Sequence, residues 1–468
     1  MSEMPAHIHL VGIGGINMSA IAKLLLRSGI KVSGSDAAVS EQTEELTRKG
    51  IPVSIGQDTS HLPADASLVI YSSAVPERNP ERLEARARNL RQLTNFEFLA
   101  EWAQDQDVVL VTGTHGKSTT TALAGLMLIE AELDPLVIVG SKVPSFPDGN
   151  VRSGAGKIWL IEGDEYARHF LAFHPKAVLI NNIELDHTDI FPTLDHMIDA
   201  FRELLHQVRD GGVVVANADD RNVSTLLGSE RTALEARGIR IVTYGYGAHA
   251  MVRVSDEAIR AGEQQFLVKD EAGHLIRATL RVPGKMNICN AVGAAALSLA
   301  LGTPPDAVRN AVQSFKGIWR RFEQISDKDG VLVISDYGHH PTAIRATLDA
   351  ARSFYPGRRI LLCFQPHQHN RTRQLFLDFV PAFDLADVLI LVEIYDVPGR
   401  KTAQDEQISS QDLYDAIRHH DADRLCQRPL EFAHTPADAL PLIERLKHKG
   451  DIVIVMGAGD VYKIADKI

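Results

Sequence analysis

Short runs of aliphatic and β-branched residues alternate with helix-like stretches along most of the chain. The first hundred residues contain the runs "HIHLVGI", "KVSGSD" and "SLVIYSSA", separated by stretches with helical spacing. Alternating strands and helices predict a parallel sheet, because the connection between parallel strands must cross one face of the sheet. We therefore expect an α/β fold.

Two interruptions divide this alternation into three units. The polar segment "EWAQDQD" ends the first unit, and the strand pattern starts again after "FKGIWRRFE". A chain of 468 residues is too long for one ordinary core, and typical domain sizes give roughly three domains. We expect the domain limits to be residues 1–104, 105–318 and 319–468.

Composition and charge argue against several classes of protein. The formal net charge of −11 disfavours a broad nucleic-acid surface, and no apolar run approaches the ~18 residues of a membrane span. The opening "MSEMPAHIHLVGIGG" lacks the basic and apolar regions of a signal peptide. The three cysteines form no CxxC pair, which argues against a disulfide framework. We expect a cytoplasmic protein that binds neither nucleic acid nor a membrane.

The stretch "LVTGTHGKSTTTALAGLML" has the order strand, glycine loop, helix. This order places the amides of Gly116 to Thr119 at a helix N-terminus, where unpaired N–H groups and the helix dipole attract an anion. Lys117 adds a charge for the β- and γ-phosphates, and the Ser118 hydroxyl can ligate magnesium. The pattern is a GTxGK[ST] variant, since Val111 occupies the first glycine position of the usual motif. An ordinary strand-to-helix turn with an exposed lysine is the alternative.

Acidic residues follow two later strands. The run "IWLIEGDE" ends with Glu162, Asp164 and Glu165, and "AVLINNIELDHTD" ends with Asn182, Glu184, Asp186, His187 and Asp189. In open α/β sheets, ligands bind beyond the carboxyl ends of the strands, so both groups can face the phosphate loop. Magnesium prefers oxygen ligands, which suits Glu162 together with Ser118. Solvated strand ends are the alternative for Asp164 and Asp189.

The first turn, "HLVGIGGINMS", resembles a dinucleotide-binding fingerprint whose last glycine is replaced by Asn17. Its glycines, Gly12, Gly14 and Gly15, can approach a diphosphate, and Asp36 stands where an acid would hold a ribose hydroxyl. The motif does not decide which nucleotide binds. An NAD-dependent oxidoreductase is therefore an alternative enzyme class.

Histidine and arginine gather in the third unit. The segments "WRRFEQI", "DYGHHPT" and "FQPHQHNRTRQL" supply Arg320, Arg321, Asp336, Tyr337, His339, His340, His367, His369, Arg371 and Arg373. Guanidinium groups match both carboxylates and phosphates, so this composition favours a pocket for an acidic, phosphorylated ligand. Zinc binding by the doublet His339–His340 is a weaker alternative, because no cysteine or third spaced ligand accompanies it.

Taken together, "VGIGGINMS", "GTHGKSTTT", "EGDE", "NNIELDH", "GKMNICNA", "RRFE", "DYGHHPT", "FQPHQHNRT" and "GAGD" occur in the order found in the Mur ligase superfamily. The chain resembles these ATP-dependent, amide-forming enzymes of peptidoglycan synthesis over essentially its full length. The resemblance implies a Rossmann-like N-terminal domain for a UDP-sugar and a central P-loop-type ATPase domain with a mostly parallel sheet. It also implies a C-terminal Rossmann-like α/β domain with amino-acid contacts.

The resemblance further implies roles for individual residues. The ATP contacts would be Gly113, Thr114, His115, Gly116, Lys117, Ser118, Thr119, Asn287, Asn290, Arg321 and Asp336. The contacts to the UDP-sugar substrate or the amino acid would be Gly12, Gly14, Gly15, Asp36, Ser73, His115, Tyr337, His339, His367 and Arg371. Magnesium would be held by Ser118, Glu162 and His187, and the catalytic residues would be Lys117, His187, Arg321 and His339.

The implied reaction joins the carboxylate of UDP-N-acetylmuramate to L-alanine through an acyl phosphate, with ATP and Mg²⁺ as cofactors. The segments "EGDEYARHF" and "NNIELDHTDIF" lean toward a related member of the superfamily, which joins L-alanyl-γ-D-glutamyl-meso-diaminopimelate to the same sugar. We expect small-molecule substrates as partners, and a monomer or a homodimer.

Overall fold

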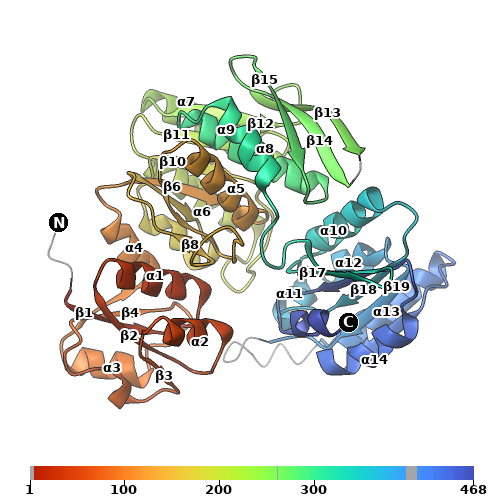
Figure 1. The fold of residues 1–468 in the computed structure, drawn as a ribbon, viewed down its shortest axis with the longest axis horizontal. Helices are drawn as coiled ribbons and strands as arrows, with labels where there is room; N and C mark the ends of the chain where they lie inside the picture. The colour runs from red at the N-terminus through yellow and green to blue at the C-terminus, as the bar shows by residue number, and fades with distance from the viewer. Residues whose placement is uncertain (1–4, 261, 397–407) are drawn as a thin grey trace.

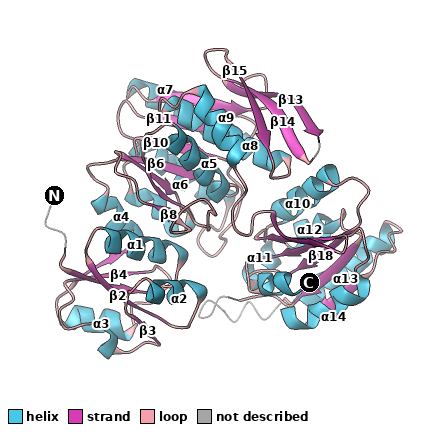
Figure 2. Ribbon diagram, viewed as in Figure 1, coloured by secondary structure: helices cyan, strands magenta, loops and turns pink. Residues whose placement is uncertain are grey.

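Three separate sheets, each flanked by helices, form the three lobes of the molecule (Figures 1 and 2). The computed structural model describes residues 5–260, 262–396 and 408–468. Each sheet is built from one continuous part of the chain, so the predicted three-domain α/β fold is confirmed. The domain limits 1–104, 105–318 and 319–468 stay a prediction, and each of the three ranges includes residues outside the described part.

The N-terminal sheet has five parallel strands in the order β3-β2-β1-β4-β5. Its elements are β1 (His7–Val11), α1 (Ile16–Arg27), β2 (Lys31–Asp36), α2 (Glu41–Arg48), β3 (Val53–Ile55), β4 (Leu68–Tyr71), α3 (Pro80–Ala87), β5 (Arg91–Thr94) and α4 (Asn95–Trp102). β1 is buried along its whole length because it lies in the middle of the sheet. The strand order reverses between β1 and β4, and a crevice at such a point is where doubly wound sheets bind ligands.

The central sheet has ten strands in the order β15-β14-β13-β12-β11-β10-β6-β9-β7-β8. Strands from β13 to β7 pair in parallel, and antiparallel strands complete both ends. The polar segment within residues 251–282 contains β13, β14 and β15. The strands are β6 (Asp107–Thr112), β7 (Leu136–Ile138), β8 (Val151–Arg152), β9 (Ile158–Glu162), β10 (Ala177–Ile180), β11 (Val213–Asn217), β12 (Arg240–Gly245), β13 (Val252–Arg260), β14 (Glu263–Lys269) and β15 (Leu275–Leu280).

Apolar helices cover the central sheet. The helices of this lobe are α5 (Lys117–Glu130), α6 (Leu194–Gln207), α7 (Arg221–Ala236), α8 (Lys285–Ala300) and α9 (Pro305–Ser314). α5 and α8 pack against each other, and both are buried over most of their length, as expected for helices that are apolar all round. This packing fixes the start of α5, where the phosphate loop ends, beside the polar residues of α8.

The C-terminal sheet has the order β16-β17-β21-β18-β19-β20, with β16 antiparallel and the others parallel. Its strands are β16 (Glu323–Lys328), β17 (Val331–Asp336), β18 (Ile360–Phe364), β19 (Val388–Val392), β20 (Leu430–Ala433) and β21 (Ile452–Met456). Its helices are α10 (Pro341–Phe354), α11 (His369–Gln374), α12 (Phe376–Phe379), α13 (Ser410–Asp423) and α14 (Pro436–Leu446). The carboxyl ends of β17 and β18 carry the histidine and arginine segments singled out in the sequence.

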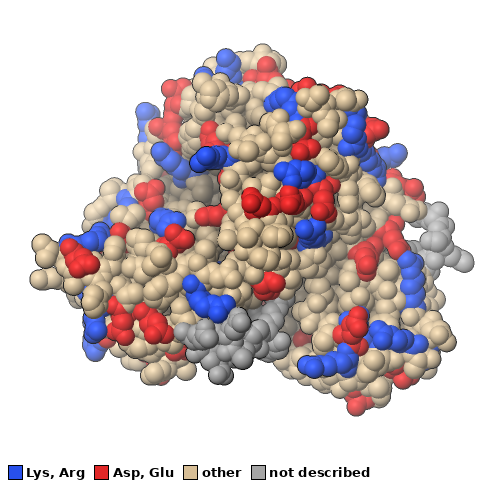
Figure 3. Space-filling view, turned by 180° about the vertical axis from the view of Figure 1, so that it is seen from behind, with Lys and Arg blue, Asp and Glu red and all other residues tan. Residues whose placement is uncertain are grey.

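None of the helices in the described part of the chain combines the length and the apolar character that crossing a bilayer requires. On the face shown in Figure 3, acidic and basic side chains are interspersed. This face therefore has no extended basic surface of the kind that nucleic-acid-binding proteins use.

Candidate active site

The phosphate loop connects β6 to α5. Gly113 has φ 129°, and Gly116, with φ 81°, is the N-cap of α5. Positive φ favours glycine, and a Cβ added to Gly116 would lie 2.2 Å from Oδ1 of Asn290. The described residues provide α5 with no side-chain cap, so its first amides can bind an anion. The predicted order of strand, loop and helix is confirmed.

Lys117 is the first residue of α5, and its side chain points back onto the loop. Its Nζ donates hydrogen bonds to the carbonyl oxygens of Gly113 at 2.7 Å and Thr114 at 3.3 Å, and to Oε1 of Glu165 at 2.8 Å. Burial lowers the pKa of Lys117, but Glu165 and other carboxylates outweigh burial, so the net shift is upward. The side chain is therefore a protonated amine at neutral pH.

Ser118 and Glu162 form the oxygen pair that the sequence suggested for magnesium. The Ser118 hydroxyl donates to Oε1 of Glu162 at 2.9 Å, and Oε2 of Glu162 accepts from the Gly140 amide at 2.5 Å. Burial raises the pKa of Glu162 although Lys117 opposes the shift. Two oxygen donors at the wall of one cavity fit the coordination preference of magnesium.

His187 lies across the same cavity. Its Nε2 is 3.4 Å from Oε1 of Glu165 and 4.0 Å from Oδ2 of Asp186. Burial lowers the pKa of His187, but Asp186 and Glu165 outweigh it and raise the pKa overall. To ligate a metal, this imidazole must therefore lose its proton.

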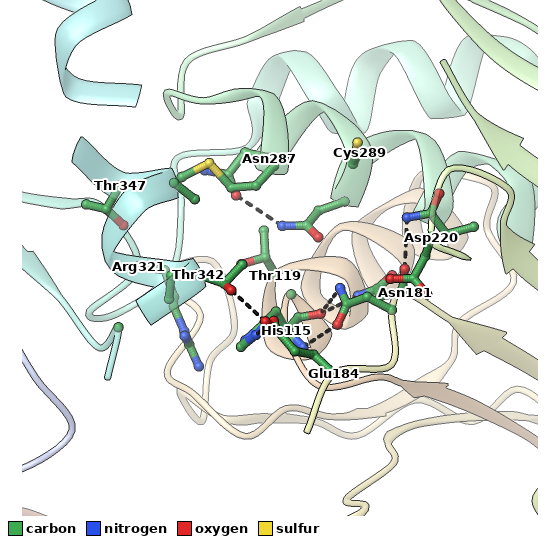
Figure 4. Close-up of a pocket in the computed structure, with 18 of the residues that line it drawn as sticks. His115, Thr119, Asn181, Glu184, Asp220, Asn287, Cys289, Arg321, Thr342 and Thr347 are labelled. Atoms are coloured by element: carbon green, nitrogen blue, oxygen red, sulfur yellow. Dashed lines mark hydrogen bonds and ion pairs between the residues drawn. The ribbon is translucent and has the colours of Figure 1, made fainter. Parts of the chain in front are cut away.

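A first cavity of about 540 Å³ opens on one side of the phosphate loop. Figure 4 shows that α8 contributes Asn287 and Cys289 to one wall, whereas Arg321 comes from the opposite side. Seven of the residues predicted to contact ATP line this cavity: His115, Gly116, Thr119, Asn287, Asn290, Arg321 and Asp336. The volume and the mixed polar lining suit a nucleoside.

A second cavity of about 440 Å³ opens on the other side of the loop. It is lined by nine further residues of the prediction: Thr114, Lys117, Ser118, Glu162, His187, Tyr337, His339, His367 and Arg371. Five residues line both cavities, namely His115, Gly116, Arg321, Gly338 and Ala343. The two cavities thus meet at the phosphate loop.

Arg371 and His339 reach the second cavity from the C-terminal domain. Nε and Nη2 of Arg371 each lie 2.8 Å from Oδ1 of Asp186, in an ion pair whose side chains are only 4% and 5% exposed. Arg371 and His187 hold the pKa of Asp186 well below its usual value against the effect of burial. Nδ1 of His339 donates to the carbonyl oxygen of Tyr337 at 3.1 Å, which leaves Nε2 as an acceptor. Burial, aided by Arg371, lowers the pKa of His339 to about 3.

Two further contacts between domains were missed by the sequence reasoning. Thr342 donates to Oε1 of Glu184 at 2.7 Å, and Asn370 donates to the Thr188 hydroxyl at 3.1 Å. Oε2 of Glu184 also accepts a hydrogen bond from Nε2 of His115 at 2.9 Å. The acidic motif after β10 signalled Glu184 and Asp186, but nothing local indicated that their partners lie in the C-terminal domain.

Left-handed backbone conformations occur at the wall of the second cavity. The non-glycine residues His187, Arg320 and Gln368, which line it, have φ between 50° and 67°. Such conformations cost about 1–3 kcal/mol each and gather at functional sites, because only a tightly constrained surrounding maintains them. The strain supports a functional role for the segments at this cavity.

The N-terminal residues predicted to bind the UDP-sugar lie apart from both cavities. Gly12, Gly14, Gly15, Asp36 and Ser73 line neither of them, although Ile16 and Gln42 reach the edge of the second. Asp36 accepts a hydrogen bond from the Gly14 amide at 2.8 Å, so it braces the glycine turn. Gly113 likewise lies behind the cavity walls. The ligand roles of all these residues stay predictions.

Comparison with known proteins identifies the family. Three family models match: "Mur ligase family, catalytic domain" at residues 7–107, "Mur ligase middle domain" at 111–298, and "Mur ligase, glutamate ligase domain" at 320–459. A UDP-N-acetylmuramate–L-alanine ligase of Solibacter usitatus is 36% identical, with 99% of this chain and 95% of the relative covered. The chain belongs to the Mur ligase family. A second relative of the same name, from Geobacter sp., is 35% identical over 98% of this chain and 96% of its own length.

Solved structures of Mur ligases have the same fold. The UDP-N-acetylmuramate–alanine ligase of Thermotoga maritima has a TM-score of 0.81 and 27% identity, covering 98% of this chain and 97% of its own. A murein peptide ligase of Psychrobacter arcticus has a TM-score of 0.70, 23% identity and 99% coverage of both chains, which supports the fold alone. These matches favour the Mur ligase interpretation over the NAD-dependent oxidoreductase.

Proposed function

We propose that this Mur ligase forms an amide bond between the carboxylate of UDP-N-acetylmuramate and L-alanine, using ATP, in peptidoglycan synthesis. The observation that carries the proposal is the pair of cavities that meet at the phosphate loop. One has polar asparagines suited to a nucleoside, and the other has the cations and carboxylates that phosphoryl transfer needs. The full-length similarity to alanine ligases supports L-alanine as the amine.

In the first step, the muramyl carboxylate attacks the γ-phosphorus of ATP and ADP leaves, which yields an acyl phosphate. The first cavity would hold the nucleoside beside Asn287 and Asn290, and the α5 amides would bind the phosphates. Lys117, the first residue of α5, would contact the β- and γ-phosphates beside the loop and offset their growing charge. Arg321 lines both cavities, so it can contact the phosphoryl group on either side of the transfer.

Ser118 and Glu162 would hold one magnesium ion, and His187 would contribute to a second. Bound magnesium would neutralise phosphate charge. Ser118 follows Lys117 in the sequence, and Glu162 is close enough to Lys117 for their charges to interact. Both oxygen donors therefore lie beside the residue that would contact the phosphates, which supports this assignment.

In the second step, the amine of L-alanine attacks the acyl carbon, and phosphate leaves from the tetrahedral intermediate. The attacking amine must be the free base, which has released its proton to solvent. His339 is neutral at neutral pH, and its Nε2 can accept a hydrogen bond from this amine at the wall of the second cavity. His367, Tyr337 and Arg371 would bind the carboxylates of the substrates.

The N-terminal domain would bind the UDP moiety. Gly12, Gly14 and Gly15 lie at the turn between β1 and α1, near the point where the strand order of the sheet reverses. Such turns accept a diphosphate on backbone amides. Asp36, the last residue of β2, and Ser73, which follows β4, would contact the rest of the nucleotide.

Phosphate release from ATP tests the proposal directly. UDP-N-acetylmuramate is supplied with L-alanine in one reaction and with L-alanyl-γ-D-glutamyl-meso-diaminopimelate in another. We expect release with L-alanine and at least tenfold slower release with the tripeptide. Faster release with the tripeptide would identify the tripeptide, and not L-alanine, as the amine substrate. No release with either amine would refute the proposed reaction.

A further inference from the structure

Glu165, to which no role is assigned above, lies between two of the proposed catalytic side chains. It is 1% exposed, and its Oε1 accepts a hydrogen bond from Nζ of Lys117 at 2.8 Å. The same oxygen lies 3.4 Å from Nε2 of His187. A single carboxylate oxygen therefore connects the phosphate loop with the segment that follows β10.

The second oxygen of Glu165 has a different environment. Oε2 is buried and has no hydrogen-bond partner among the described residues. Buried carboxylate oxygens are almost always paired, because an unpaired one has lost its hydration without replacement. Glu165 also lines the second cavity, so its carboxylate lies at the candidate active site and not in the hydrophobic core.

The backbone after β9 fixes the direction of Glu165. Ala167 and Arg168 have φ 48° and 58°, a conformation that non-glycine residues adopt only where the surroundings demand it. The Arg168 amide donates to the carbonyl oxygen of Glu165 at 2.9 Å and closes the turn. The side chain of Glu165 is thus held toward the loop and away from solvent.

We propose that Glu165 is a positioning residue, which holds the Lys117 ammonium and the His187 imidazole in one fixed arrangement for phosphoryl transfer. This inference rests on the proposed function. Groups that are already oriented accelerate a reaction because they need no rearrangement in the transition state. Loss of Glu165 therefore lowers kcat and leaves the affinity for ATP nearly unchanged.

The first test compares E165Q, E165A and E165D in steady-state phosphate release. We expect E165Q and E165A to lose at least tenfold in kcat while KM for ATP stays within threefold of wild type. E165D keeps the charge and is expected to retain more activity than E165Q. A kcat above half of wild type in E165Q would overturn the proposal, as would equal losses in all three variants together with lowered melting temperatures.

Glu81 provides a matched control. It is a fully buried glutamate of the N-terminal domain, hydrogen-bonded to His9 at 2.8 Å and to Ser35 at 2.7 Å. E81Q removes one buried carboxylate charge, as E165Q does, but at a distance from the phosphate loop. It is expected to lower the melting temperature and to keep kcat within threefold of wild type. A tenfold loss of kcat in E81Q would show that such losses report folding alone and would overturn the proposal.

A measurement without turnover separates this inference from the proposed function. The imidazole ¹⁵N resonances of His187, assigned by comparison with H187Q, should move in E165Q and stay in place in E81Q. Unmoved resonances in E165Q would overturn the positioning role. Shifted resonances, combined with a wild-type protein that turns over neither amine, would instead support the positioning geometry and refute the proposed reaction.

Discussion

The Lys117 ammonium at the phosphate loop is paired with a carboxylate that is almost fully buried. Lys117→Ala is expected to reduce phosphate release from ATP to below a hundredth of wild type, because the charge that would stabilise the transferred phosphoryl oxygens is lost. It should also lower the free energy of unfolding by about 3 kcal/mol, since Glu165 is left buried without its counter-ion.

The double variant Lys117→Ala, Glu165→Gln separates these two effects. Removing the uncompensated charge should restore most of the stability, measured by urea unfolding, without restoring phosphate release. Recovery of turnover in the double variant would contradict the proposed role of Lys117.

His339 gives the unfolding free energy a defined dependence on pH. Its pKa is about 3 in the folded protein, against about 6.5 in an unfolded chain. Between these values the unfolded state binds a proton that the folded state does not, so His339 destabilises the fold increasingly as pH falls.

The glutamine of the variant His339→Gln does not titrate. As pH falls from 6 to 4, wild type should therefore lose unfolding free energy relative to the variant, by at most about 1.4 kcal/mol per pH unit. A constant difference over this range would contradict the neutral imidazole.

The strand, loop and helix conformation around the phosphate loop could be predicted because the motif is local. Gly116, Lys117 and Ser118 are adjacent in the sequence, and a strand pattern before them and a helix pattern after them suffice to define the turn. The pairing of Lys117 with Glu165 could not be predicted, because 48 positions separate these residues. Their contact depends on β6 lying next to β9 in the sheet, and hydrophobic periodicity does not encode the order of strands.

At the scale of the element, the start of α5 depends on glycine. Gly116→Ala should lower the affinity for ATP at least tenfold, because the added Cβ collides with Asn290 and displaces the first turn of the helix. Isothermal titration calorimetry with a non-hydrolysable ATP analogue measures this loss.

Gly211→Ala is the matched control, since Gly211 has φ 67° and no heavy atom within 4 Å of an added Cβ. It should cost about 1 kcal/mol of stability from backbone strain and leave nucleotide affinity unchanged. Equal affinities in the two variants would contradict the steric argument.

Elements with long apolar runs could be predicted, and short ones at the edges of sheets could not. The buried strands β6, β10 and β21 stand out as continuous aliphatic runs. β3 and β8 have only 3 and 2 residues and lie at sheet edges, where half of the pattern is polar. Too few residues remain there to show a period of two.

At the scale of the whole molecule, the buried pair of Arg371 and Asp186 joins the C-terminal domain to the central domain. Asp186→Asn should shift the molecule toward arrangements in which these domains are separated, because the charged contact that offsets the burial of Arg371 is lost. Small-angle X-ray scattering should then show a larger radius of gyration than wild type.

Asp451→Asn is the control for this change. Asp451 pairs with Arg359 at 2.8 Å inside the C-terminal domain, so its loss affects that domain without touching the contact between domains. Its radius of gyration should equal that of wild type. An unchanged radius in Asp186→Asn would show that the other contacts suffice to hold the domains together.

The number and order of the domains could be predicted, whereas their mutual arrangement could not. Asn370 and Thr188 are 182 positions apart, and both lie in loops or at helix starts without a regular pattern. The motifs therefore indicated candidate site residues, and only the structure brings the segments after β10, β17 and β18 to one cavity.

The shared wall of the two cavities has a consequence for inhibitor chemistry. Since His115, Gly116 and Arg321 line both cavities, a compound with an adenosine-like group in one and an acidic group in the other need only pass this shared wall. Binding of one end would hold the other at high effective concentration, so two weak fragments joined by a short linker could reach an affinity that neither has alone.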